Sequence, residues 1–330
     1  MRFGPVPLEQ AEGTILAHGL TLGELRLKKG HLLRVADLAG LAAAGVAAVT
    51  VARLDPDDLA EDQAAAIIAA ALVPDPDAQG LRIGAAGSGR VNLYATGPGV
   101  IVADAGAIGR LNAVDPMITL ATLPPFQRVA DGAMVATVKI ISYAVPRQAV
   151  VLAVAAGRAA LRRAGPTLPD ASLIETVIPG RDLPGKGRTA MAARLDRLGL
   201  RLTPPIRVAH DEDALATAIA AAPGAAILIL TASATSDVLD VAPAALCRAG
   251  GEVIRFGMPV DPGNLLFLGR LGPRPVIGLP GCARSPALNG ADWVLERVLC
   301  GIEVTAADIA AMGVGGLLKE IPIRPRPREG

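Results

Sequence analysis

The residues best suited to chemistry follow an apolar run in the stretch ILTASATSDVLDVAP, residues 229–243. Hydroxyl groups and backbone amides at the start of a helix suit a phosphate, and paired carboxylates suit Mg²⁺ or the positioning of a nucleophile. Capping of a helix by Ser236 or Asp237 is the alternative, but a cap requires only one such residue. The hydroxyl residues are Thr231, Ser233, Thr235 and Ser236, and the carboxylates are Asp237 and Asp240.

A second stretch, VIGLPGCARSPALN, also ends an apolar run with a turn. Pro280 and Gly281 predict that turn, and the guanidinium of Arg284 offers a planar fork that can bind phosphate or carboxylate through two bonds. Ser285 is suited to cap a helix with Pro286 in its first position, where the missing amide hydrogen costs nothing. A ligand site and a helix start are compatible here.

A third stretch, VIPGRDLPGKGRT, has the glycines and the lysine of a phosphate-binding loop. Such loops place a serine or threonine directly after the lysine, where its hydroxyl binds magnesium. Here Gly187 follows Lys186. An exposed basic loop is therefore favoured, and a P-loop-like nucleotide-binding enzyme is the weaker alternative.

These stretches need a scaffold that brings them together, and residues 146–301 have the pattern of one. Apolar strand candidates such as AVVLAVA, AAILIL and PVIG alternate with helical patterns. This alternation predicts a mostly parallel sheet with helices on both faces, a three-layer α/β domain. Ligands of such sheets bind beyond the carboxyl ends of the strands, so we expect the site in the loops after AVVLAVA, AAILIL and PVIGLP.

The chain before this region has a different pattern. VADLAGLAAAGVAAVTVARL predicts a helix, a glycine turn and a strand, and short strands with turn residues follow PDPDAQG. Thr137 and Lys139 are expected on the polar face of a half-buried strand, with a surface for a partner as the alternative. We expect an α+β segment over residues 1–75, a small β-rich domain over 76–146, the α/β domain over 147–303 and a proline- and arginine-rich tail or linker over 304–330.

The composition excludes several classes of partner. A net charge of +1 and an aromatic content of 2% argue against nucleic acid. The uncharged run 214–236 is long enough to cross a membrane, but Pro223 and Gly224 divide it into a helix and a strand, so no membrane partner is expected.

The cysteines and histidines favour a reducing cytoplasm without a structural metal. None of the cysteines forms a CxxC pair, so neither a disulfide framework nor a structural zinc site is expected. For Cys282 a small buried thiol is favoured over a nucleophile, because no histidine lies in its motif. The histidines are scattered along the chain, which gives a histidine-built metal site little support. The residues concerned are Cys247, Cys282 and Cys300, and His18, His31 and His210.

Three motifs, in this order, resemble the molybdopterin-binding domain family, which includes molybdopterin adenylyltransferase and molybdopterin molybdotransferase. The matches are Asp240-Val241-Ala242-Pro243 to Asp-Val-x-Pro, Pro262-Gly263-Asn264 to Pro-Gly-Lys, and Gly278 to Gly281 with Ser285 to Gly-Leu-Pro-Gly-Asn-Pro-x-Ser. The resemblance covers residues 148–301. The whole chain is similar to the N-terminal module found fused to molybdenum cofactor cytidylyltransferase-like proteins.

This resemblance implies a role in molybdenum cofactor biosynthesis or maturation, with molybdopterin or its nucleotide form held by its phosphate at helix starts. Asp240 is the implied catalytic residue and ligand of a Mg²⁺ ion. A cytidylyltransferase-like domain or protein is the implied partner, and self-association is typical of the family. The implied cofactor-binding residues are Thr231, Ser233, Thr235, Ser236, Asp237, Gly263, Asn264, Pro280, Gly281, Cys282, Arg284 and Ser285.

The sequence also departs from the family motifs. Ala232-Ser233 replaces a Gly-Gly pair, Cys282-Ala283-Arg284 follows Pro280-Gly281, and Gly185-Lys186-Gly187 replaces Asp-Ser-Asn. Cations are gained and neutral polar groups are lost, so an anion site with altered chemistry is expected. A transferase and a non-catalytic cofactor carrier, which serves a nucleotidyltransferase or a molybdenum enzyme, both stay open.

Overall fold

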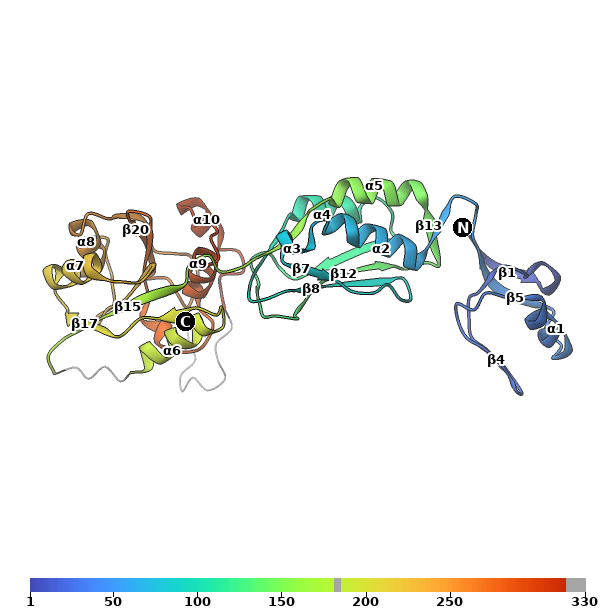
Figure 1. The fold of residues 1–330 in the computed structure, drawn as a ribbon, viewed down its shortest axis with the longest axis horizontal. Helices are drawn as coiled ribbons and strands as arrows, with labels where there is room; N and C mark the ends of the chain where they lie inside the picture. The colour runs from blue at the N-terminus through green and yellow to red at the C-terminus, as the bar shows by residue number, and fades with distance from the viewer. Residues whose placement is uncertain (181–184, 319–330) are drawn as a thin grey trace. The chain divides into compact units, whose positions relative to one another are not determined.

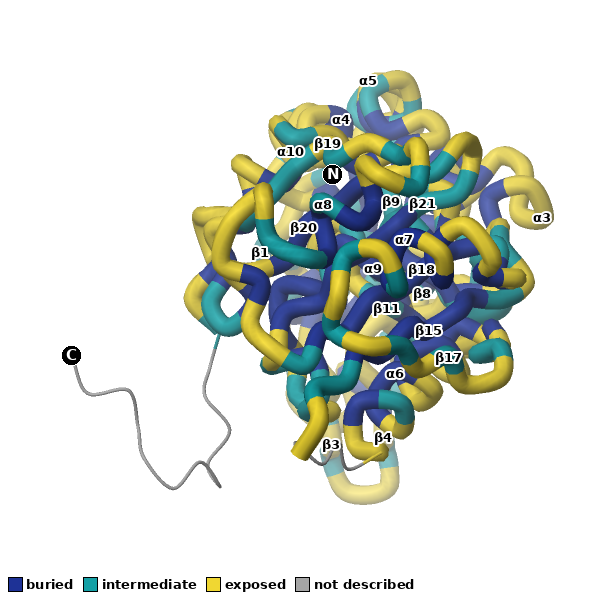
Figure 2. Tube along the Cα trace, turned by 90° about the vertical axis from the view of Figure 1, so that its left-hand side faces the viewer, coloured by how far each residue is buried: buried dark blue, intermediate teal, exposed yellow. Residues whose placement is uncertain are grey.

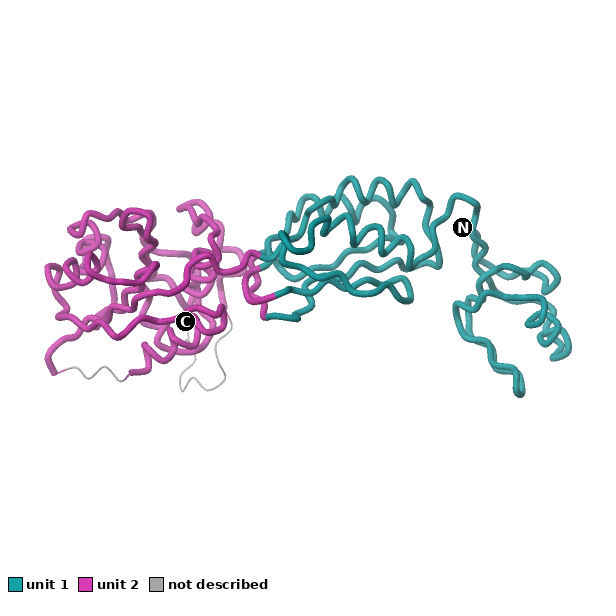
Figure 3. Tube along the Cα trace, in the orientation of Figure 1, with its two compact units in different colours: residues 1–96, 101–125, 131–163 teal, residues 97–100, 126–130, 164–330 magenta. Residues whose placement is uncertain are grey.

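The structure is a computed structural model that describes residues 1–180 and 185–318. Residues 181–184 of the candidate phosphate loop and residues 319–330 of the expected linker lie outside this part. The chain divides into two compact units (Figure 3). Unit 1 comprises residues 1–96, 101–125 and 131–163, and unit 2 comprises residues 97–100, 126–130 and 164–330.

The start of unit 1 is a small sheet with one helix. β1 pairs with β5 and β5 with β2, all antiparallel, and β3 and β4 form a hairpin. The expected helix, glycine turn and strand are confirmed, with Gly45 in the left-handed conformation between α1 and β5. The elements are β1 (Arg2–Pro7), β2 (Ile15–Leu16), β3 (Leu20–Leu22), β4 (Leu25–Leu27), α1 (Val35–Ala43) and β5 (Ala48–Arg53).

The remainder of unit 1 is built on a four-stranded antiparallel sheet in the order β10–β12–β8–β7. Helices α2, α4 and α5 lie on one side of it (Figure 1). The expected strands of this region are confirmed, whereas α4 was not predicted. The elements are β6 (Asp58–Ala60), α2 (Glu61–Leu72), α3 (Pro76–Gln79), β7 (Leu81–Ile83), β8 (Arg90–Ala95), β9 (Gly99–Ala103), α4 (Ala105–Asn112), β10 (Ile118–Thr122), β12 (Met134–Ile140), β13 (Ala144–Pro146), α5 (Arg147–Gly157) and β14 (Leu161–Ala164). Strand β11 (Arg128–Val129) belongs to unit 2.

One predicted strand is wrong. AVVLAVAAG forms most of helix α5 and belongs to unit 1, although we expected it to open the α/β domain. A short apolar run has no clear period, so a strand buried on both faces and a buried helix look alike. The run packs as a helix because it lies against α2 and α4 and not inside a sheet.

Unit 2 confirms the α/β class, with a seven-stranded sheet among its described residues. The order is β16–β15–β18–β21–β20–β19, and β17 also pairs with β15. β15, β16, β17, β18 and β21 are parallel, whereas β20 and β19 are antiparallel additions at one side. The strands are β15 (Asp170–Val177), β16 (Arg201–Leu202), β17 (Ile206–Ala209), β18 (Ala226–Leu230), β19 (Glu252–Phe256), β20 (Phe267–Leu271) and β21 (Arg274–Gly278).

Burial explains the apolar runs of this sheet. All five residues of β18 are buried. Figure 2 draws most of β15, β18 and β21 in the dark blue of buried residues. The edge strand is interrupted between β16 and β17 at Pro204 and Pro205, which have no amide hydrogen for the ladder. Gly278 ends β21 against the ring of Phe267, which a side chain at this position would strike.

Helices cover both faces of the sheet. Helices α7 and α8 bury Leu215, Ile219 and Leu246 against one face together with Ile227 and Ile229. Helix α6 lies on the other face and is joined to α9 by an ion pair. The helices are α6 (Lys186–Asp196), α7 (Glu212–Ala221), α8 (Val241–Arg248), α9 (Gly290–Leu299) and α10 (Ala306–Ala311), with a 3-10 turn over Gly281–Arg284.

Candidate functional site

The candidate site lies at the carboxyl ends of β15, β18 and β21. From β15 the chain continues to β17 on one side, and then to β18 on the other side of β15. Ligands of open α/β sheets bind at such a switch point, because the loops there leave in opposite directions. Register places Leu230 beside Glu175, and Gly278 beside Ile229. Two of the three expected loops therefore meet. The third follows helix α5 of unit 1, so that prediction was wrong.

The loop after β18 is held by side-chain hydroxyls. Thr231 donates from Oγ1 to the carbonyl oxygen of Ser233 at 2.5 Å and lies 3.3 Å from Oγ1 of Thr235. The amide of Ala232 donates to Oγ1 of Thr176 at the end of β15, at 2.8 Å. Oγ1 of Thr176 also lies 2.9 Å from Nδ1 of His210. The loop is thereby fixed to β15 directly at the switch point.

Arg284 joins the second predicted loop to the first. Its Nη2 donates to the carbonyl oxygen of Thr231 at 2.7 Å. Burial lowers the pKa of the Arg284 guanidinium, and the carboxylate of Glu175 opposes this shift. Glu175 itself is 3% exposed and also lies 3.7 Å from Nε of Arg207. A half-buried cation therefore stands between the loops after β18 and β21, with its counter-charge behind it in β15.

The start of helix α6 lies against these residues. A side chain at Gly187 would come within 3.2 Å of Oε1 of Glu175 and 3.5 Å of Cγ of Arg284, and would strike Leu230. No side chain among the described residues caps this helix, and its first turn contains Lys186 and no acidic residue. Backbone amides at a helix start favour an anion, and here basic side chains add to the same field.

A buried arginine positions the second loop. Arg194 of α6 donates to the carbonyl oxygens of Ala283, Ser285 and Ala287 at 3.0, 2.9 and 3.0 Å. It also pairs with Asp292 of α9, with Nε 2.5 Å from Oδ1. The sequence analysis missed this residue. Its signal is its place on the buried stripe of α6, where helical spacing calls for an apolar side chain.

Asp240 has a structural role. It caps helix α8, because Oδ1 accepts the amide of Val241 at 2.7 Å and Oδ2 accepts the amide of Ser236 at 2.9 Å. The predicted cap at Ser236 or Asp237 is therefore wrong. Ser233, Ser236 and Asp237 are exposed in the loop before this helix.

The turn after β21 is confirmed, but the helix start proposed there is wrong. Gly281 begins the 3-10 turn that follows Pro280, and Ser285 donates its amide to the carbonyl oxygen of Cys282 at 3.0 Å. Helix α9 begins only at Gly290 and is capped by Asn289, whose Oδ1 accepts the amide of Ala291. Asn289 with Asp292 makes a capping box, a stronger signal than Ser285 with Pro286.

Gly263 and Asn264 have contacts of another kind. A side chain at Gly263 would strike the backbone of Gly290, so the turn lies directly on the start of α9. The carbonyl oxygen of Asn264 accepts the amide of Met258 at 3.0 Å. Gly263 and Asn264 therefore support the region before α9. The predicted residues Thr231, Thr235 and Arg284 do lie at the switch point. Three further residues lie there that the sequence analysis did not select: Glu175, Thr176 and Gly187.

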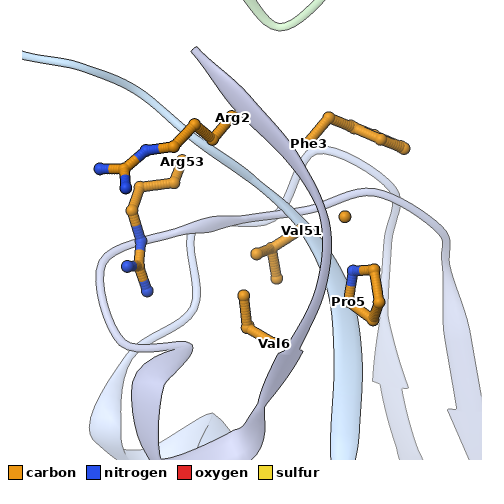
Figure 4. Close-up of a pocket in the computed structure, with 7 residues that line it drawn as sticks. Arg2, Phe3, Pro5, Val6, Val51 and Arg53 are labelled. Atoms are coloured by element: carbon orange, nitrogen blue, oxygen red, sulfur yellow. The ribbon is translucent and has the colours of Figure 1, made fainter.

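A shallow hollow lies in another part of the chain, in unit 1. It is lined by residues of β1 and β5, where Arg2 and Arg53 lie on one side of β1 and Phe3 and Pro5 on the other (Figure 4). This hollow is open and shallow, and its cations are already engaged: Arg2 with Asp55, and Arg53 with the carbonyl oxygen of Gln10. The switch point of unit 2 brings together more charged and hydroxyl side chains than this hollow does, so it is the candidate site.

The described residues contain neither a cluster suited to a metal ion nor a helix suited to a membrane. No group of three or more histidine, cysteine, aspartate or glutamate residues is placed to hold a metal ion. No helix in this part of the chain is long and apolar enough to cross a membrane.

Comparisons with known proteins give a family model and two distant structures. A domain of unknown function, DUF8806, matches residues 5–53. No curated protein matches the chain. The chain is similar to the molybdopterin biosynthesis moea protein from Pyrococcus horikosii, at a TM-score of 0.31 and 16% identity over 91% of this chain and 75% of that chain. It is also similar to a molybdenum cofactor biosynthesis protein from Pyrococcus furiosus, at 0.24 and 13% over 94% and 65%. TM-scores this low do not support the transfer of a function.

Proposed function

We propose that unit 2 binds the phosphate of molybdopterin, or of its nucleotide form, at the switch point of its sheet, and that the protein acts in molybdenum cofactor maturation. The observation that carries this proposal is Arg284. Its Nη2 donates to the carbonyl oxygen of Thr231, the residue after β18, and it follows directly on the Gly-Leu-Pro-Gly stretch that resembles the molybdopterin-binding family, at a position where this sequence departs from the family motif. Two of the motifs behind the resemblance thus lie at one ligand-binding edge.

The charges of this edge suit a phosphate. The uncapped start of α6 and the guanidinium of Arg284 both present positive charge. Glu175 holds the counter-charge behind them and is 3% exposed, so it does not face a ligand above the edge. Ser233 and Ser236 are exposed and can donate hydroxyl hydrogen bonds.

Asp240 favours a binding function over the transferase that the resemblance implies. Each of its two oxygens accepts a backbone amide of the loop or helix that it caps. A carboxylate engaged in this way is a poor candidate for a base or for a Mg²⁺ ligand. A cofactor carrier that serves a nucleotidyltransferase or a molybdenum enzyme is therefore the second form of the proposal.

Anaerobic calorimetry with molybdopterin and the full chain tests the proposal. We expect a micromolar Kd for the wild type, and a loss of about tenfold or more in Arg284→Gln, since a charge-assisted hydrogen bond contributes about 1.5–3 kcal/mol. Arg201→Gln is the matched control, because Arg201 is exposed on β16 and pairs with the opposite end of β15. A wild type that binds neither molybdopterin nor its nucleotide forms contradicts the proposal.

Incubation with molybdopterin, ATP or CTP, Mg²⁺ and molybdate separates the carrier from the transferase. The carrier predicts binding without product. Turnover that is abolished in Asp240→Asn, in a variant that still binds molybdopterin, establishes the transferase instead.

A further inference from the structure

The outward face of the four-stranded sheet in unit 1 has the features of a second ligand site. Helices α2, α4 and α5 lie on one side of this sheet, and Figure 1 shows no helix of unit 1 on the other side of β8 and β12. Because side chains alternate along a strand, every second residue of each strand points to the outward face. The residues concerned are Arg82 of β7, Arg90, Asn92 and Tyr94 of β8, and Thr137 and Lys139 of β12.

This face is cationic. Register places Arg90 of β8 directly opposite Lys139 of β12. Like charges in such a pair destabilise a sheet. The four strands contain no aspartate or glutamate, and the ammonium of Lys139 donates to the carbonyl oxygen of Ser88 and interacts electrostatically with Glu61 at the start of α2. An anion bound above the pair would remove the repulsion.

An aromatic stack stands at the other end of the face. The guanidinium of Arg82 lies 4.4 Å from the ring centre of Tyr94, its partner in register. Arg82 is exposed. A guanidinium is planar and stacks on aromatic rings, so a planar ligand can stack on its free side and extend the Tyr94–Arg82 pair.

Two polar atoms between these ends lack partners. Oδ1 of Asn92 and Oγ1 of Thr137 are shielded from solvent, and neither has a hydrogen-bond partner within the described residues. The two residues face each other in register. Buried polar groups are nearly always paired, because each unpaired group costs free energy. A ligand with hydroxyl or amino groups would supply the missing bonds once the long side chains around them move aside.

We propose that this face binds a nucleoside phosphate. Tyr94, Asn92 and Arg90 follow one another at every second position of β8, about 7 Å apart. The base stacks on Arg82, the sugar hydroxyls bond to Asn92 and Thr137, and the phosphate lies between Arg90 and Lys139. The base, the sugar and the phosphate of a nucleotide are joined in this order, and the residues suited to each follow one another across the sheet in the same order. This inference does not rest on the function proposed for unit 2.

Calorimetry of the full chain with AMP tests the inference, with adenosine and inorganic phosphate as separate probes. We expect AMP to bind with a Kd below about 1 mM, and each separate probe to bind at least tenfold more weakly. Arg90→Gln should weaken AMP binding about tenfold and Thr137→Val about threefold. Arg110→Gln is the control on α4, which packs on the other side of the sheet.

Three results overturn the inference: no heat with AMP, equal weakening in Arg90→Gln and Arg110→Gln, or tighter binding of inorganic phosphate than of AMP. A single-stranded oligonucleotide that binds more than tenfold tighter than AMP overturns it in favour of nucleic acid. Arg284→Gln should leave AMP binding unchanged, so failure at this face and failure at the switch point of unit 2 are distinguished. Thr137→Val keeps the shape of the side chain, and circular dichroism checks that each variant is folded.

Discussion

The switch point of unit 2 and the outward sheet face of unit 1 both present cations, but they are built in different ways. At the switch point, loops far apart in sequence are held by buried polar contacts, such as Arg194 with Asp292 and Thr176 with Ala232. On the sheet face, strand register places the residues opposite one another, Arg82 stacks on Tyr94 and Lys139 donates to Ser88, but Asn92 and Thr137 keep polar atoms without partners in the described chain. Buried contacts thus position the residues of the switch point, whereas the sheet face leaves two polar atoms without a partner among the described residues.

The largest expected effect is at the clamp behind the switch point. Arg194→Met should destabilise the protein by about 3–5 kcal/mol, because it leaves the carboxylate of Asp292 buried without its partner. Urea denaturation measures the change. Arg201→Gln, on the exposed edge strand, should stay within about 0.5 kcal/mol of the wild type. A loss below about 1 kcal/mol in Arg194→Met would show that the clamp does not hold the loops.

The pH dependence of unit 2 provides a second test. Burial raises the pKa of Glu296 on α9 to about 7, and the partner guanidinium of Arg128, with Nε 2.8 Å from Oε1, opposes the shift without cancelling it. A folded pKa above the unfolded value of 4.5 means that Glu296 contributes stability below pH 4.5, and that this stability is lost as the pH rises through about 7.

Glu296→Gln removes this titration. The variant should therefore gain about 2–3 kcal/mol of stability relative to the wild type between pH 5 and pH 8. Urea denaturation of both proteins at several pH values measures the difference. Parallel stability curves across this range would mean that Glu296 titrates like an exposed carboxyl.

The close packing of α6 against the switch point can be disturbed by adding one methyl group at Gly187. Gly187→Ala should cost about 1–3 kcal/mol, because the added carbon strikes Leu230 and presses on Glu175. Gly185→Ala is the matched control, since a side chain there meets no atom of the described residues within 4 Å. If both variants have the same melting temperature, the start of α6 is not packed against the site.

Two threonine hydroxyls give the smallest and sharpest comparison. Thr176→Val should cost about 1–2 kcal/mol, because it removes the hydroxyl that accepts the amide of Ala232 at 2.8 Å and lies 2.9 Å from Nδ1 of His210. Thr137→Val removes a hydroxyl that has no partner among the described residues, so its stability should be unchanged or raised by up to about 1 kcal/mol. Thermal and urea denaturation of the two variants measure the contrast. Equal losses of stability in the two variants would contradict the contrast between the switch point of unit 2 and the sheet face of unit 1.

The sequence predicted the scaffold better than the site. The alternating strands and helices of unit 2 and the turn at Pro280 and Gly281 follow from local patterns, and all are present. Helix α5 was mistaken for a strand because its apolar run has no period. The true start of α9 at Asn289 was missed because Pro286 gave a nearer local signal.

The remaining site residues depend on contacts that no local pattern contains. Glu175 and Thr176 lie in β15, a strand that the sequence analysis did not predict, and only the pairing of β15 with β18 brings them to the switch point. Asp240 fits a family motif, yet its oxygens are engaged by the backbone of its own loop. Arg194 contacts carbonyl oxygens about 90 residues away, so its role required the fold.

A crystal structure of the full chain with molybdopterin bound tests the central claim most directly. We predict that the phosphate of the ligand lies within hydrogen-bonding distance of Arg284 and of the loop that follows Thr231, beside the start of α6. Molybdopterin bound anywhere else on the chain, with the switch point of unit 2 unoccupied, would contradict this account.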